Sequence, residues 1–121
     1  MILALDFDGT VTTHRYPGIG ERVPYCLEVL ERVSMYGHQI VLWTCRNGEE
    51  LDEAATYCKS NGIVLSGVNR IPSVPNKSGK IFADIYIDDR GLGTPLIDFN
   101  GEKVVDWITV ERMLCDLGWI P

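Results

Sequence analysis

Short apolar runs that end in polar residues alternate along the chain with segments of helical periodicity. Between the runs, apolar residues recur at helical spacing from Cys26 to Val33 and from Leu51 to Cys58, and Gly37 and Gly62 follow as stop signals. Strands joined by helices predict a parallel sheet with helices on both faces, which is a three-layer, doubly wound, Rossmann-like α/β fold. The strand-like runs occupy residues 1–5, 39–44, 63–68 and 83–87.

Two segments depart from this alternation. Residues 9–22 contain glycines, a proline and mixed polarity, which predicts an irregular flap after the first strand. Near the C-terminus, Asn100-Gly101 between apolar runs predicts a hairpin, and apolar residues from Trp107 to Leu117 predict a last helix. We expect the residues after 95 to complete the sheet and its covering layer, and the sequence assigns them no functional role.

Polar side chains follow several of the predicted strands at the point where each strand ends. Asp6 and Asp8 follow the first strand, Thr44 closes the second, and Asp88 and Asp89 follow the fourth. Because ligands bind outside the carboxyl ends of the strands in parallel sheets, we expect these side chains to converge on one site.

Length and charge narrow the class of protein. A chain of 121 residues with this composition is expected to form one domain over residues 1–121. Its net charge of −6 argues against long nucleic acids as partners without excluding them. No stretch has the length of a membrane span and the N-terminus lacks a signal-peptide pattern, so we expect a cytoplasmic protein without a membrane partner. The spacing of the four cysteines favours buried, reduced thiols.

Several carboxylates and a hydroxyl at one point suit a hard cation. Mg²⁺ prefers oxygen ligands in octahedral geometry and usually shares its shell with water and substrate phosphates. A carboxylate that attacks a phosphoester also needs cations to neutralise the phosphoryl oxygens. The sequence therefore predicts a phosphate site that uses Mg²⁺ as cofactor.

Four motifs in order resemble those of the haloacid dehalogenase (HAD) superfamily, in its phosphatase branch. They are DFDGT at 6–10, the apolar strand ending in Thr44, Lys80, and DIYIDD at 84–89. The match extends from residue 1 to about residue 90. The resemblance implies a HAD-like fold and a magnesium-dependent phosphohydrolase acting on an unidentified phosphoester.

The resemblance also implies roles for individual residues. Asp6 would be the nucleophile that forms an aspartyl-phosphate, and Asp8 the acid that protonates the leaving group and later the base that activates water. Thr44 and Lys80 would hold the phosphoryl oxygens. The implied metal site consists of Asp6, the backbone carbonyl of Asp8, Asp89, and Asp88 in support.

Some of these assignments keep an alternative. Lys77 lies in the same loop as Lys80 and competes for the phosphate-binding role. Arg46 either binds substrate or forms a structural ion pair. His14 and Arg15, in the flap, are candidates for substrate contact, or are simply exposed to solvent.

Segment lengths leave no room for the cap domain of larger members of the resembling superfamily. We therefore expect an open site that admits a phosphorylated small molecule or macromolecule, with a homo-oligomer as one way to cover it. A receiver domain or another phosphate-binding regulatory domain with little turnover is the alternative function. The order of the acidic motifs, with D-x-D first and D-D last, disfavours a receiver, and Asp8 would hasten hydrolysis of an acyl-phosphate that a receiver must keep.

Overall fold

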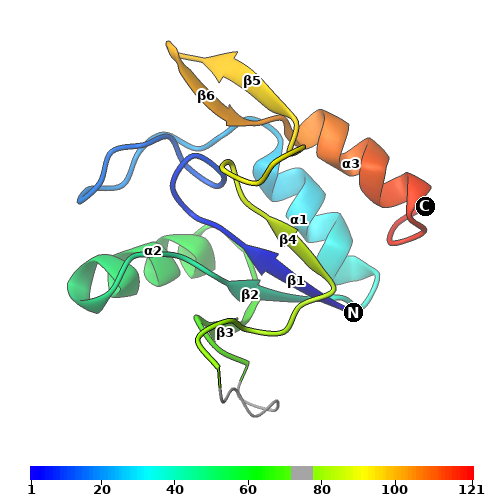
Figure 1. Ribbon diagram of the computed structural model, residues 1–121, viewed down its shortest axis with the longest axis horizontal. Coiled ribbons are helices and arrows are strands. Elements are labelled where there is room, and N and C mark those ends of the chain that lie inside the picture. The colour runs from blue at the N-terminus through cyan, green and yellow to red at the C-terminus, as the bar shows by residue number, and fades with distance from the viewer. Residues whose placement is uncertain (72–77) are drawn as a thin grey trace.

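The architecture is taken from a computed structural model, which describes residues 1–71 and 78–121. The described residues form a four-stranded sheet with the order β3-β2-β1-β4, and each neighbouring pair is parallel (Figure 1). The predicted parallel sheet is confirmed. Its strands are β1 (Ile2–Leu5), β2 (Gln39–Leu42), β3 (Leu65–Val68) and β4 (Ile85–Ile87).

The helices lie on one face of this sheet. They are α1 (Cys26–Met35), α2 (Gly48–Ser60) and α3 (Trp107–Asp116), and their buried residues share one core with Leu3 and Leu5 of β1. The expectation of helices on both faces is therefore wrong for the described residues. Right-handed connections from β1 to β2 and from β2 to β3 run in the same direction along the sheet, so α1 and α2 share a side.

The opposite face of the sheet carries a smaller apolar cluster. Ala4 and Val41 of the central strands pack there against Ile71 and Ile81, which belong to the connection from β3 to β4. This connection returns across the sheet, and the sequence places prolines and glycine in it rather than a helical pattern. A loop and not a third layer covers this face in the described part of the chain.

The predicted hairpin forms, but it does not extend the main sheet. β5 (Leu96–Phe99) and β6 (Glu102–Val105) pair as a separate antiparallel ribbon. Asn100 and Gly101 have φ of 51° and 83°, the left-handed conformations that a tight hairpin turn requires. The hairpin stays separate because β4 is the last strand of the main sheet. After β4 the chain leaves the sheet, and the hairpin reaches the loop that follows β1 (Figure 1).

Hydrogen bonds join this C-terminal segment to the loop that follows β1. The Val105 backbone N–H donates to the Gly9 carbonyl at 3.0 Å, and the Trp107 indole N–H donates to the Thr10 carbonyl at 2.8 Å. Trp107 is 1% exposed. The hairpin and α3 thus hold the backbone between Asp8 and Val11 in place.

The described residues contain no helix that is both long and apolar enough to cross a lipid bilayer.

All four cysteines are free thiols; Cys26 and Cys58 are buried, as expected, whereas Cys45 is exposed.

Replacing Trp107 by Phe tests the link between α3 and the β1 loop. The Trp107→Phe variant leaves the buried Thr10 carbonyl without its indole donor, so we expect a loss of about 1–3 kcal/mol in the free energy of unfolding, measured by urea denaturation. Ile108→Ala, at an exposed position on the same helix, is the control. Equal stability of the two variants would contradict the proposed support.

Candidate active site

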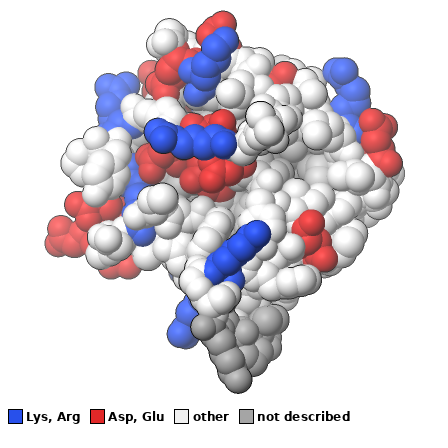
Figure 2. All heavy atoms as spheres, viewed as in Figure 1, with Lys and Arg blue, Asp and Glu red and all other residues white. Residues whose placement is uncertain are grey.

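Three carboxylates converge where β1 and β4 end. Asp6 follows β1, and Asp88 and Asp89 follow β4, the neighbour of β1, with Leu5 and Ile87 in register. One carboxylate oxygen from each of the three aspartates lies within 4.8 Å of the others. Acidic side chains gather in Figure 2 over the carboxyl end of β4, and basic side chains flank them. The convergence predicted for these aspartates is therefore present.

The surroundings of Asp6 oppose its ionisation. Burial is the largest cause, and the nearby charge of Asp88 adds to it, so the pKa of Asp6 rises from its ordinary value of 3.8 to about 8. The Thr10 hydroxyl partly offsets this effect by donating to Asp6 Oδ2 at 2.9 Å. Without a cation, the surroundings of Asp6 therefore favour its protonated form.

Two opposing effects act on the pKa of Asp89. Burial raises its pKa above the ordinary value, while its hydrogen bonds to Asp6 and His14 work in the other direction. His14 Nε2 lies 3.0 Å from Asp89 Oδ2, and the Asp89 backbone N–H donates to Thr10 Oγ1 at 3.2 Å. The Thr10 hydroxyl therefore bridges the two strand ends. Thr10 has no role in the sequence-based prediction, although its position in DFDGT is a signal for one.

The loop after β1 requires glycine at position 9. Gly9 has φ of 81°, a conformation that residues with a Cβ rarely adopt. A Cβ at this position would also collide with the Asp89 carboxylate and the His14 ring. The Phe7 carbonyl accepts N–H groups from the turn that follows, including that of Val11 at 2.8 Å. Gly9 therefore lets the flap approach the acidic cluster closely.

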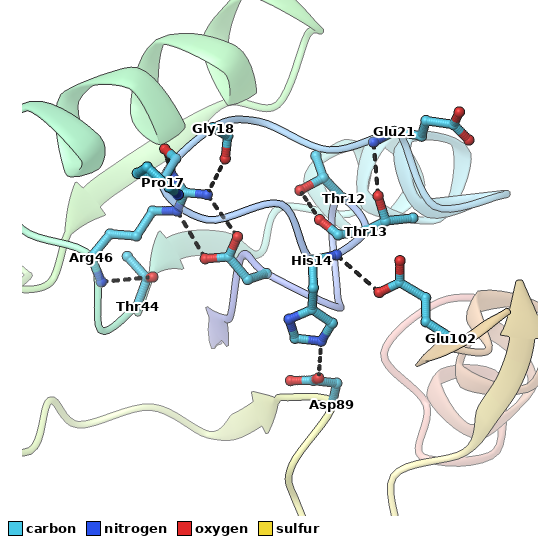
Figure 3. Close-up of polar contacts among 11 residues, drawn as sticks. Thr12, Thr13, His14, Pro17, Gly18, Glu21, Thr44, Arg46, Asp89 and Glu102 are labelled. Atoms are coloured by element: carbon cyan, nitrogen blue, oxygen red, sulfur yellow. Dashed lines mark hydrogen bonds and ion pairs between the residues drawn. The ribbon is translucent and has the colours of Figure 1, made fainter. Parts of the chain in front are cut away.

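Asp8 turns toward Arg46 rather than toward the three clustered carboxylates. Arg46 Nε donates to Asp8 Oδ2 at 2.8 Å and Nη2 donates to Oδ1 at 2.7 Å, which is a bidentate ion pair. The same guanidinium donates to the carbonyls of Pro17 and Gly18 in the flap (Figure 3). Of the two readings open for Arg46, the structure therefore contains the ion pair.

Thr44 belongs to the cleft lining and is held by its neighbours. Its backbone N–H donates to Asn69 Oδ1 at 2.9 Å, and its hydroxyl oxygen accepts the Arg46 backbone N–H at 3.2 Å. Asn69 follows β3 with φ of 55°. Asn69 has no role in the sequence-based prediction, although an asparagine directly after a strand is a signal for such a contact.

These groups surround an open cleft with a volume of about 400 Å³. The flap contributes His14 and Tyr16, and Arg90 follows the acidic pair of β4. The described residues lining the cleft are Asp6, Asp8, His14, Tyr16, Thr44, Cys45, Arg46, Asp88, Asp89 and Arg90.

Two predicted site residues are not part of the cleft lining in the described residues. Arg15 is exposed, and among the described residues around the cleft neither Arg15 nor Lys80 contributes to the lining. The Lys80 ammonium lies 4.9 Å from the centre of the Tyr86 ring. The phosphate-binding role of Lys80 stays a prediction, and the competing Lys77 falls outside the described residues.

The donor set fits a hard divalent cation. Asp6, Asp88 and Asp89 offer carboxylate oxygens. Mg²⁺, Mn²⁺ and Ca²⁺ prefer such hard oxygen ligands over softer nitrogen and sulfur ligands. Partial burial and mutual repulsion make the cluster costly when it is fully ionised. A bound cation would remove that cost, so these residues could hold a metal at the floor of the cleft.

Comparison with known proteins gives one informative relative. No protein-family model matches the sequence, and no curated protein matches it. A solved structure of a conserved protein coded by a locus of Bacteroides thetaiotaomicron superposes with a TM-score of 0.82 and 36% sequence identity. The alignment covers 97% of this chain and 91% of that one. The two proteins belong to one family. This family relationship supports the fold across nearly the whole chain.

Substitution of Gly9 by alanine tests the close approach of the flap. Gly9→Ala adds a Cβ that meets Asp89 and His14, whereas Gly37→Ala adds one where φ is equally positive, 84°, but no atom lies within 4 Å. We expect Gly37→Ala to cost about 1 kcal/mol of stability and Gly9→Ala clearly more, measured by thermal unfolding. Equal losses would show that backbone conformation alone requires Gly9.

The raised pKa of Asp6 predicts a pH-dependent stability of the metal-free protein. Between pH 4 and 8 the folded state keeps a proton on Asp6 that the unfolded state releases, so this group makes folding less favourable as the pH rises. In EDTA, Asp6→Asn should therefore raise the melting temperature relative to wild type by several degrees at pH 8 and by clearly less at pH 5. A difference independent of pH would refute the raised pKa.

Proposed function

We propose that the protein is a magnesium-dependent phosphohydrolase of the haloacid dehalogenase type, acting on a phosphomonoester through an aspartyl-phosphate. The observation that carries the proposal is the convergence of Asp6, Asp88 and Asp89 at the carboxyl edge of a parallel sheet, with Asp8 two residues beyond Asp6 in the same cleft. This edge is where such sheets bind ligands.

In the proposed reaction Asp6 is the nucleophile. One of its carboxylate oxygens attacks phosphorus, the bond from phosphorus to the ester oxygen breaks, and the leaving oxygen takes a proton from Asp8. Asp8 then accepts a proton from a water molecule that attacks the aspartyl-phosphate, which releases inorganic phosphate and restores both carboxyl groups. Mg²⁺ bound by Asp6, Asp88 and Asp89 would supply the charge neutralisation that lets a carboxylate approach a phosphate.

Other residues of the cleft have roles in binding the phosphoryl group. The Thr44 hydroxyl oxygen accepts the Arg46 backbone N–H, which leaves its own proton able to donate to a phosphoryl oxygen. Arg90 supplies a cationic side chain in the cleft lining. The amphiphilic flap residues His14 and Tyr16 form the part of the wall that a substrate's leaving group would meet.

The expected open site is part of this proposal. In the described residues, the chain between β1 and α1 forms a flap without a helix of its own, and α2 with β3 fills much of the interval from β2 to the returning loop. A phosphorylated small molecule and a phosphorylated macromolecule both remain substrate classes that such a cleft admits, and a second subunit is one means of covering it.

Phosphate release tests the function. The purified protein is assayed on a panel of sugar phosphates, nucleotides, phosphopeptides and aryl phosphates with Mg²⁺ or EDTA. We expect turnover that requires Mg²⁺ and that Asp6→Asn lowers by at least about 1,000-fold, because the amide cannot act as the nucleophile. Asp116→Asn, at an exposed position in α3, is the matched control.

Two results would contradict the proposal. Turnover that survives Asp6→Asn would exclude the aspartyl-phosphate route. Binding of Mg²⁺ and phosphate without turnover on any substrate would favour a regulatory, phosphate-binding domain instead.

A further inference from the structure

Arg46 is charged and yet almost completely enclosed. Its side chain is 1% exposed, and its guanidinium carbon lies 5.0 Å from the centre of the Phe7 ring and 5.2 Å from that of Tyr16. Hydrogen bonding to Asp8 raises the pKa of Arg46, so the guanidinium keeps its charge in spite of burial. A buried cation of this kind requires specific partners.

Those partners belong to two separate parts of the active-site wall. The Nε and Nη2 groups bind both carboxylate oxygens of Asp8, while Nη1 and Nη2 reach the carbonyls of Pro17 at 3.1 Å and Gly18 at 2.6 Å. Four of the five guanidinium N–H groups are thus used within the protein. In Figure 3 the Arg46 guanidinium lies next to the flap carbonyls of Pro17 and Gly18.

This arrangement leaves Arg46 poorly suited to bind substrate. A phosphate would have to displace Asp8 or the flap carbonyls to gain a bidentate contact with the guanidinium. The Asp8 carboxylate, by contrast, is 20% exposed and lines the cleft. Each carboxylate oxygen has a second lone pair beyond the one that Arg46 uses, so Asp8 can still exchange a proton with a group in the cleft.

We propose that Arg46 is a positioning residue that fixes the rotamer of Asp8 and anchors the flap over it, so that proton transfer by Asp8 depends on Arg46. This inference rests on the proposed phosphohydrolase function. It assigns Arg46 a role in the departure of the leaving group rather than in phosphate binding. The step that distinguishes this role is proton donation from Asp8 to the ester oxygen as its bond to phosphorus breaks, because the later activation of water by Asp8 is common to all substrates.

The dependence of rate on the leaving group separates this role from a general structural one. We compare 4-nitrophenyl phosphate, whose phenolate departs with little help from an acid, with 4-nitrobenzyl phosphate, whose alkoxide must be protonated as it leaves. The two substrates are similar in size and aromatic character. Misplacement of Asp8 should therefore affect the benzyl ester far more than the phenyl ester.

The variants are Arg46→Met, which removes every guanidinium hydrogen bond, and Arg46→Lys, which keeps a cation but cannot bind Asp8 and both carbonyls together. We expect Arg46→Met to lower kcat/KM, which covers only the steps up to departure of the leaving group, by about 100-fold for the benzyl ester and by less than about tenfold for the phenyl ester. Arg46→Lys should give the same pattern to a smaller extent. Arg112→Met, at an exposed position in α3, is the matched control.

An Asp8→Asn background completes the test. If Arg46 acts through Asp8, adding Arg46→Met to Asp8→Asn should change kcat/KM for the benzyl ester by less than about threefold. Circular dichroism and thermal unfolding check that each variant is folded. Should Arg46→Met not fold, Arg46→Lys alone decides between the two patterns.

The possible failures are distinguishable. Equal losses of kcat/KM on the two esters, or no loss on either, would overturn the positioning role and leave the phosphohydrolase intact. A rise in KM with unchanged kcat would overturn it in favour of substrate binding by Arg46. If the wild-type protein hydrolyses neither ester nor any other phosphoester with Mg²⁺, the proposed function fails, and this inference fails with it.

Discussion

Repulsion among the carboxylates of Asp6, Asp88 and Asp89 is the constraint to which the rest of the site responds. The sheet order places β1 beside β4, so the acids at their ends are forced together in a partly buried position. Proton retention by Asp6, donation from the Thr10 hydroxyl and the approach of His14 all reduce the cost. A divalent cation would do so more completely, which is the physical basis for proposing a metal site here.

The acids stay together because distant segments hold the loop that carries them. Backbone bonds from Val105 and the indole of Trp107 fix the carbonyls of Gly9 and Thr10. The Glu102 carboxylate also accepts the His14 backbone N–H at 3.0 Å, which ties the flap to the hairpin (Figure 3). The C-terminal segment therefore supports the site. Among the described residues that line the cleft, none belongs to this segment.

Two parts of the cleft wall are held by different means. The acidic floor depends on strand ends and the β1 loop, whereas Asp8 and the flap depend on one buried guanidinium. This division suits a reaction in which phosphorus is attacked at the floor and a proton moves at the wall. Under the proposed function, the floor would govern binding and attack, and Arg46 would govern the proton transfer through Asp8.

The sequence by itself determined the parallel sheet, the hairpin and the location of Asp6, Thr44, Asp88 and Asp89 at strand ends. These features depend on local periodicity, turn residues and the rule that carboxyl ends of parallel strands share one edge. The resemblance to the haloacid dehalogenase superfamily does not follow from these local rules. The roles that it implies for individual residues stay proposals.

Only the tertiary structure decided which side chains meet. The choice between substrate contact and ion pair for Arg46 depended on the path of the flap, which local pattern does not encode. Placement of the helices on one face and of the hairpin beside Gly9 followed from crossover handedness and from where the last strand ends. The position of the Lys80 ammonium beside the Tyr86 ring is likewise a tertiary contact that local pattern does not encode.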